Sequence, residues 1–411
     1  MTRRITRLLL AAALCLAGSL PAAARPVLDT AVAPTAIIDQ VGEIVRREFY
    51  DPGALGPFNA AQDEARARAE RGELAAASAD WLRVLGASHT GRFTPDGIDY
   101  YELSEVFRRG ISNIRELFPP EGAVSYPGIG LVPGEIGGRL FATHVYDGGP
   151  AARAGIRPGD EILSVGGESY RPIASFEGRV GETVRLEIRR RQGEAPRTVE
   201  VGVARLQPRE VFLDAIRESA RVFDRGDRKI GYLRLWAYAF RGVEDTLAEL
   251  LTSEPLREAD GLVLDMRGRW GGAPADAAEM FVGRAPHMVV TNRKGEVRVA
   301  NMRWRKPVVG IIDKGSRSGM EILAHGLQSA GVPLVGTRTA GDVLAGRAFR
   351  LRDNSLLEVA VLDVHVDGER LEGTGVTPDI AVPFDIRFAA GADPQRDRAI
   401  DEMISLLSVT E

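Results

Sequence analysis

Apolar runs and helical repeats alternate along the second half of the chain, between residues 207 and 390. Short, almost continuous apolar runs are typical of strands buried on both faces, whereas apolar positions every three or four residues are typical of helices. The pattern predicts strands at 230–235, 261–265 and 307–312, and helices at 243–251, at 275–282 and after residue 318. This order predicts an α/β core with parallel strands over residues 207–390. A last helix, within residues 391–411, should begin near Pro394.

The earlier part of the chain has two other textures. Residues 25–115 are predicted to be mostly helical, because Ile37, Val41 and Val45 follow helical spacing and an Ala/Arg/Glu-rich stretch at 60–77 indicates a solvated helix. A small polar loop, residues 86–91, follows. Residues 116–206 contain short β-branched runs separated by Gly and Pro, which predicts a separate β domain.

The first 24 residues are typical of a secretory leader. A basic start at Arg3, Arg4 and Arg7 precedes a short apolar stretch, and Ala22–Ala24 forms an A-x-A cleavage pattern. The alternative is an uncleaved anchor, although the apolar stretch is short for a membrane span. We therefore expect a secreted, periplasmic protein with no membrane span after cleavage. Its one cysteine, Cys15, lies in this leader, so no disulfide is expected.

Overall charge excludes two classes of partner. The formal net charge is −4, which gives no electrostatic case for binding nucleic acid or an anionic membrane. The sequence has no His/Cys/Asp/Glu cluster with metal-ligand spacing, and no Gly-rich loop carries a Lys that could hold phosphates. We therefore expect neither metal nor cofactor. The sequence predicts no particular oligomeric state.

The turn at residues 313–322 joins a predicted buried strand to a predicted helix and carries two serines, Ser316 and Ser318. A hydroxyl at a helix N-terminus faces backbone N–H groups and a dipole that favour developing negative charge, as a serine nucleophile requires. The alternative is that either serine only caps the helix. A second small-residue turn, at Gly271 and Gly272, exposes backbone N–H groups that suit an oxyanion hole, although a Gly-Gly pair is more often a plain turn.

Two stretches of the β domain resemble a PDZ domain. Residues 147–167 resemble a PDZ signature, and the match is specific; it includes Gly148, Gly149, Pro150, Gly155 and Gly159-Asp160. A second stretch resembles the PDZ loop that binds a carboxylate: Gly128, Ile129, Gly130 and Leu131. The resemblance implies that this domain recognises the C-terminal segment of a polypeptide substrate or partner. The alternative is a β domain that only packs.

Four stretches, in this order, resemble the C-terminal processing (tail-specific) serine peptidases and their tricorn-like relatives. They are the PDZ signature, Asp265 to Gly272, Gly315 to Ile322, and Leu371 to Asp379. The resemblance implies a crotonase-like α/β peptidase core with an inserted PDZ domain. It also implies that Ser318 is the nucleophile, with oxyanion N–H groups on Gly319 and on Gly271 or Gly272.

The sequence departs from the tail-specific branch at the catalytic base. That branch uses a lysine shortly after the nucleophile, but the matching position is Asp342 and no lysine follows Ser318. Tricorn-like relatives use a Ser-His pair and a late Glu, which match Ser88-His89 and Glu372. A histidine suits base chemistry near neutral pH, and Ser88 with Glu372 would fix its tautomer. His325, two turns along the helix after Ser318, is interpreted as structural.

Three functions follow from these residues. The first is a secreted serine endopeptidase that uses Ser318 and His89. The second is an inactive pseudopeptidase that kept its PDZ domain and acts as a binding or scaffold protein, which the missing lysine motivates. The third, an acyl-CoA enzyme, conflicts with a leader that removes the chain from cytosolic CoA.

Overall fold

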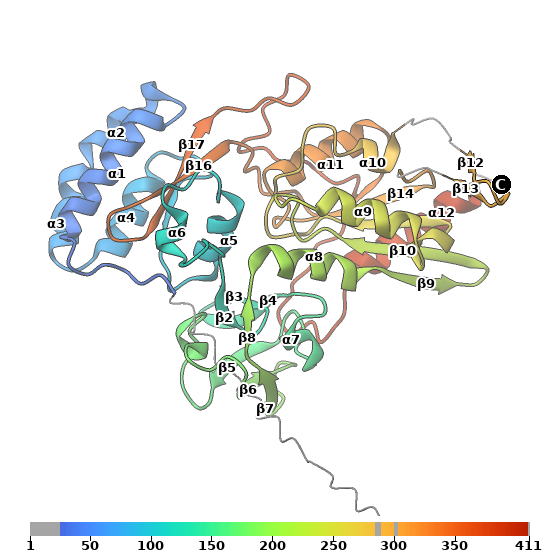
Figure 1. Ribbon diagram of the computed structural model, residues 1–411, viewed down its shortest axis with the longest axis horizontal. Coiled ribbons are helices and arrows are strands. Elements are labelled where there is room, and N and C mark those ends of the chain that lie inside the picture. Colours follow the sequence, from blue (N-terminus) through green and yellow to red (C-terminus); the bar gives the residue numbers. More distant parts are fainter. Residues whose placement is uncertain (1–24, 284–288, 300–302, 410–411) are drawn as a thin grey trace, which may run out of the picture.

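The computed structural model of the protein describes residues 25–283, 289–299 and 303–409. The predicted leader, residues 1–24, lies outside the described residues. The described chain forms an N-terminal helical layer, a small β domain and a larger α/β core (Figure 1). Within these described ranges, no helix combines the length and the apolar character needed to cross a membrane.

The N-terminal layer combines helices with strands from much later in the chain. Its helices are α1 (Pro34–Glu48), α2 (Leu55–Ala60), α3 (Gln62–Glu70), α4 (Leu74–Arg83), α5 (Ile98–Val106) and α6 (Ile114–Leu117). They cover a sheet ordered β1 (Gly91–Phe93), β17 (Leu356–Leu362), β16 (Ala345–Arg350), and Figure 1 shows the blue helices beside the orange strands. The single helix predicted at 60–77 is two helices, because Gly72 adopts φ +89° between them. The loop at 86–91 is therefore held against residues near 345–360.

The β domain is a five-stranded sheet with a small ribbon. Sheet order is β3 (Leu131–Ile136), β4 (Arg139–Val145), β5 (Glu161–Val165), β6 (Thr183–Arg189), β7 (Arg197–Gly202). The ribbon pairs β2 (Tyr126–Gly128) with β8 (Ala204–Leu206), and α7 (Pro150–Arg153) is a single turn. An apolar cluster of its own, which includes Phe176 and Leu186, holds this domain together. Because β3 is an edge strand, a further strand could pair with it.

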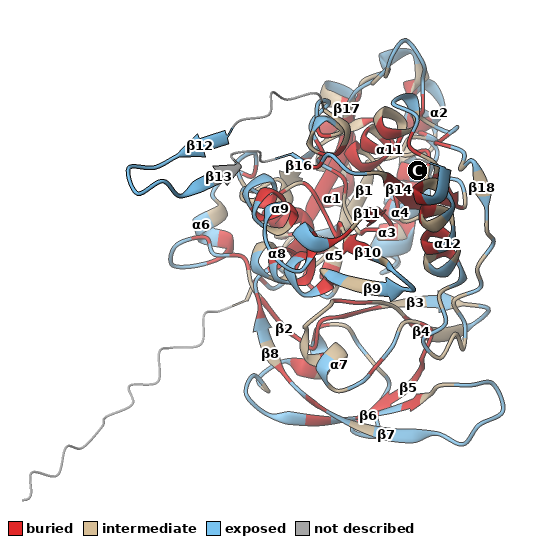
Figure 2. Cartoon of the chain, turned by 90° about the vertical axis from the view of Figure 1, so that its right-hand side faces the viewer, coloured by how far each residue is buried: buried red, intermediate tan, exposed pale blue. Residues whose placement is uncertain are grey.

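The core confirms the predicted α/β alternation. Its sheet is ordered β18 (Ile380–Ala381), β15 (Leu334–Gly336), β14 (Val308–Ile312), β11 (Gly261–Asp265), β10 (Arg228–Arg234), β9 (Arg221–Arg225), and only the β9–β10 pair is antiparallel. Its helices are α8 (Pro208–Ser219), α9 (Val243–Thr252), α10 (Glu279–Val282), α11 (Gly319–Ser329) and α12 (Pro394–Val409). A hairpin of β12 (Val289–Thr291) and β13 (Val297–Val299) projects from it (Figure 2), and Val289, Val290 and Val297 on this hairpin are exposed.

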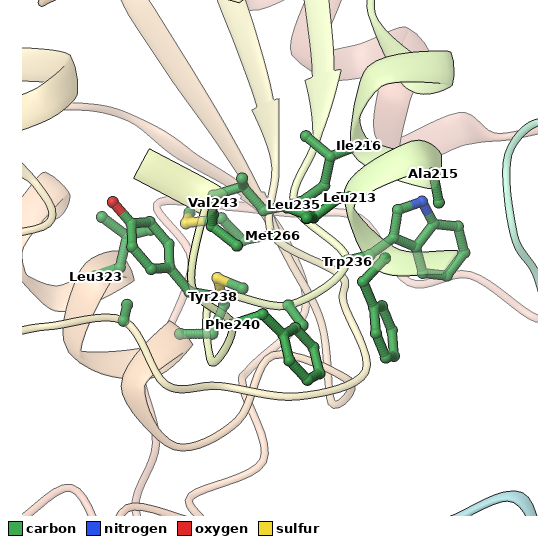
Figure 3. Packing of buried hydrophobic residues seen from close by; sticks show 14 of the residues in the cluster. Leu213, Ala215, Ile216, Leu235, Trp236, Tyr238, Phe240, Val243, Met266 and Leu323 are labelled. Carbon is green, nitrogen blue, oxygen red and sulfur yellow. The ribbon is translucent and has the colours of Figure 1, made fainter. Parts of the chain in front are cut away.

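Each face of the core sheet is covered by different helices. Val263 and Val309 pack on α12, whereas Leu262 and Leu264 point to the other face, as the two-residue period of a strand requires. On that second face, residues of α8, of the segment after β10 and of α11 meet, including Tyr238, Phe240 and Leu323 (Figure 3). This packing places the ends of β10, β11 and β14 beside the start of α11.

The helix predicted at 275–282 is wrong in extent, because α10 covers only Glu279–Val282. The preceding residues wind more tightly than an α-helix. Ala277 N–H donates to Pro274 O, and Met280 N–H donates to Ala277 O, both between residues three apart. Such i to i+3 bonds are typical of a 3₁₀ turn, which an apolar spacing alone cannot distinguish from an α-helix.

Candidate active site

Ser318 lies at the junction between β14 and α11 with an unusual backbone conformation. Its φ is +55° and its ψ is −133°, in a region that costs a non-glycine residue about 1–3 kcal/mol. A serine held on such a sharp strand-to-helix turn projects its hydroxyl at the helix start. The Ser318 N–H donates to the Asp342 carbonyl oxygen at 2.8 Å, and the Glu321 carboxylate lies 3.2 Å from the same nitrogen. These contacts hold the strained residue in place.

Ser316 has a different environment. It is fully buried, and its hydroxyl donates to the Met266 carbonyl oxygen at 2.8 Å and accepts from the Asp313 N–H at 3.2 Å. This hydroxyl is thus occupied in joining the turn to the end of β11. The local pattern left both serines open and the family resemblance implied Ser318; of the two, only Ser318 has the strained backbone, and only Ser316 has a hydroxyl that joins the turn to β11.

Two glycine backbones press directly against Ser318 and Gly319. A side-chain carbon at Gly271 would lie 2.6 Å from both Ser318 Cβ and Gly319 N, and one at Gly319 would lie 2.8 Å from Gly272 N. No larger residue fits at either position. Among the described residues, the N–H groups of Gly271, Gly272 and Gly319 donate no hydrogen bond. Free N–H groups beside a nucleophile can stabilise an oxyanion.

Ser88 and His89, in the loop before β1, form a chain of hydrogen bonds with Glu372. Ser88 Oγ lies 2.9 Å from His89 Nδ1 and donates to a Glu372 carboxylate oxygen, also at 2.9 Å. Because the hydroxyl has one proton and gives it to Glu372, it accepts from Nδ1–H, which leaves Nε2 unprotonated. This is the tautomer that a general base needs.

The Glu372 carboxylate is fixed by the backbone as well. It accepts from the N–H groups of Ser88 at 3.0 Å, Val343 at 2.7 Å and Leu344 at 3.2 Å. Residues 343 and 344 directly follow Asp342, whose carbonyl oxygen holds the Ser318 N–H. One segment therefore connects the loop at 86–91 to the turn at 313–322.

The electrostatic surroundings keep His89 neutral. Burial lowers the pKa of the His89 imidazole below its ordinary value, and the Arg317 guanidinium lowers the pKa further, against the opposing carboxylates of Asp342 and Glu372. Arg317 is paired with Asp342 at 2.7 Å. His89 thus lies within electrostatic range of the residue that precedes Ser318. In the described chain, however, no hydrogen bond joins the His89 ring to the Ser318 hydroxyl.

Sequence reasoning missed the buried carboxylate of Glu321. It accepts from Thr339 Oγ1 at 2.5 Å, Gly341 N at 2.7 Å and Asp342 N at 2.8 Å, in addition to its contact with Ser318 N. The signal was present, because Ser318-x-x-Glu321 is a capping-box spacing. Glu321 fixes the segment at 339–342 against the start of α11.

A cleft of about 960 Å³ reaches this region from one side, with Gly272 in its wall. Its other walls are the segment at 105–115, the segment at 238–242 after β10, and Arg347 with Ala348 on β16. A cleft of this size is sufficient for several residues of an extended polypeptide.

The loop at 128–131, predicted to bind a carboxylate, joins β2 to β3, and none of its residues lines this cleft. All four of its residues are buried, and the carbonyl oxygens of Ile129 and Gly130 accept from Ala151 and Tyr146 N–H groups. The β domain meets the core close to the glycine pair. The Tyr146 hydroxyl donates to Glu102 at 2.5 Å, and Glu102 also accepts from Arg269 and Trp270, the residues before Gly271.

Comparison with known proteins identifies two domains. Residues 229–382 match peptidase family S41, and residues 141–190 match the PDZ domain. The carboxy-terminal processing protease CtpB of Bacillus subtilis is 28% identical over 283 residues, which cover 65% of this chain and 57% of that protein. The putative tricorn protease homolog 2 of Streptomyces coelicolor is 26% identical over 406 residues, 90% of this chain and 32% of that protein. The chain thus spans little more than half of the first relative.

A solved structure also shares the fold. The photosystem II D1 C-terminal processing protease superposes with a TM-score of 0.50 at 20% identity, over 89% of this chain and 98% of that one. The fold described above is therefore that of an S41 peptidase with a PDZ domain.

Proposed function

Because the chain carries a peptidase family S41 domain and a PDZ domain, we propose that it is a serine endopeptidase acting through an acyl-enzyme on Ser318. The observation that carries the proposal is the strained turn at Ser318, packed without space for a side chain against Gly271. Strained residues of this kind are retained where function needs them.

In this mechanism Ser318 Oγ attacks the carbonyl carbon of a peptide bond, and its proton passes to His89 Nε2. The oxyanion accepts hydrogen bonds from Gly319 and from Gly271 or Gly272. His89 then protonates the leaving amine, and a water molecule, deprotonated by His89, hydrolyses the acyl-enzyme. Ser88 and Glu372 hold the ring through Nδ1. Since Ser318 and His89 are not hydrogen-bonded, substrate binding must bring the ring to the hydroxyl, as happens in many unliganded active sites.

The PDZ domain supplies the expected substrate class. Its edge strand β3 suits the C-terminal segment of a polypeptide, and the PDZ resemblance assigns the terminal carboxylate to the loop at 128–131, which is buried before a ligand binds. CtpB is named as a carboxy-terminal processing protease, and we propose the same kind of substrate for this chain. The leader predicted at residues 1–24 supports a periplasmic location.

Cleavage of an unfolded, fluorescein-labelled casein tests the proposal. Ser318→Ala and His89→Ala should each abolish cleavage, whereas the matched exchanges Ser405→Ala, at an exposed position of α12, and His325→Ala should retain it. Full activity of Ser318→Ala or His89→Ala would refute the mechanism.

A pseudopeptidase is the second candidate. The missing contact between Ser318 and His89, and Asp342 where related peptidases carry lysine, favour it. In that case the purified protein would bind polypeptide C-termini through its PDZ domain and would release no casein fragments.

A further inference from the structure

Glu358 is a buried acid that the mechanism above does not use. It lies on β17, where it pairs with Gly91 of β1 on one side and Ala348 of β16 on the other. The residue is only 6% exposed, and within the described chain its carboxyl group has neither a hydrogen bond nor an ion pair. Its oxygens are not fully sealed from solvent, but a carboxyl group that has lost most of its hydration and has no protein partner is still costly, so its retention calls for a functional reason.

The carboxyl group of Glu358 lies beside His89. A side-chain carbon placed on Gly346 would be 2.8 Å from Glu358 Oε1 and 3.1 Å from His89 Cβ. Those two atoms are therefore at most 5.9 Å apart, the sum of the two distances. Glycine at 346, on β16, leaves the space between them open.

Four charged or titratable groups, each from a different element, lie near Glu358. The Arg317 guanidinium comes from the turn at 313–322, Asp99 from α5, Asp342 from the segment after β15, and His89 from the loop before β1. Burial raises the pKa of Glu358 to about 7, with Asp99 and Asp342 adding to the rise and Arg317 opposing it. Glu358 thus changes charge in the range where a peptidase works, next to the proposed base.

We propose that Glu358 is a positioning residue for His89, whose ionised carboxylate stabilises the imidazolium formed when His89 takes the Ser318 proton. The inference rests on the proposed function. Ser88 and Glu372 orient the neutral His89 ring through Nδ1, whereas the Glu358 carboxylate stabilises the positive charge of the protonated ring. A carboxylate oxygen at most 5.9 Å from His89 Cβ favours the protonated ring, and the partial burial of both groups strengthens the effect.

The pH profile of kcat/KM tests this role. In the wild-type protein, activity should rise as His89 loses its proton, then rise again near pH 7 as Glu358 ionises. Glu358→Gln should remove the second rise, with activity near wild type at pH 5.5 and about tenfold lower at pH 8.5, equal to about 1.4 kcal/mol of barrier. The control Glu249→Gln, an equal charge change at an exposed position of α9, should keep the wild-type profile.

An unchanged profile in Glu358→Gln would overturn the inference, and the same assay separates it from failure of the mechanism. If Ser318→Ala is inactive and Glu358→Gln matches wild type, only the role of Glu358 is wrong. If Ser318→Ala is active, the proposed function itself is wrong. Should Glu358→Gln not fold, Glu358→Asp replaces it. That variant should keep the second rise with smaller amplitude, and a full-amplitude rise would overturn the inference.

Discussion

The backbone strain at Ser318 predicts that glycine is more stable than alanine at this position. With φ at +55° and ψ at −133°, any residue with a Cβ pays about 1–3 kcal/mol there, and glycine does not. Against this, glycine loses more conformational entropy on folding than alanine, which costs the folded protein about 0.5–1 kcal/mol. Ser318→Gly should therefore be more stable than Ser318→Ala by about 1 kcal/mol, and both should be inactive.

Calorimetric unfolding of the two variants measures this difference. For a core of this size, about 1 kcal/mol corresponds to a melting temperature higher by about 2–4 °C. Ser405, exposed in the middle of α12, provides the control pair. There the order should reverse, because glycine within a helix is about 1 kcal/mol less favourable than alanine. The same reversed order at Ser318 would refute the strained turn.

Three further variants test the surroundings of the site. As pH rises from 4.5 to 8, Glu358→Gln should become more stable than wild type by up to about 3 kcal/mol in urea unfolding. The reason is that folding raises the pKa of Glu358 from 4.5 to about 7, so the unfolded chain ionises first and wild type loses stability over this range. Stability curves that stay parallel would contradict this. Glu102→Gln should cost about 3 kcal/mol, since it leaves Arg269 partly unpaired while buried; a loss below 0.5 kcal/mol would contradict this. Glu372→Gln should lower kcat at least hundredfold by releasing Ser88; unchanged kcat would show that the hydrogen-bond chain is not used.

Much of the core was predictable because its strands are buried on both faces. The runs at 261–265 and 307–312 became β11 and β14 within one residue. The local apolar pattern identifies these strands because helices cover both faces of a parallel sheet, so every position along the strand is apolar. Spacing could not show that the segment at 275–278 is a tight turn, since 3₁₀ and α-helical periods are similar over four residues.

The candidate site was predictable only where one short stretch carries its own chemistry. The residues of the turn at 313–322 left both serines open and only the family resemblance pointed to Ser318, whereas the dihedral angles of Ser318 and the burial of Ser316 give that choice a physical basis. Glu358 could not be found, because one acid in a β-branched run resembles any strand position. Its proximity to His89 depends on β17 pairing with β1, residues more than 260 positions apart.

Labelling with a fluorophosphonate probe, located by mass spectrometry, tests the central claim most directly. We expect one adduct on Ser318 in the wild-type protein, none in Ser318→Ala, and a strongly slowed adduct in His89→Ala. The Ser405→Ala control should label like wild type. An adduct on another serine, or full-rate labelling of Ser318 without His89, would contradict the assignment of Ser318 as nucleophile and His89 as its base.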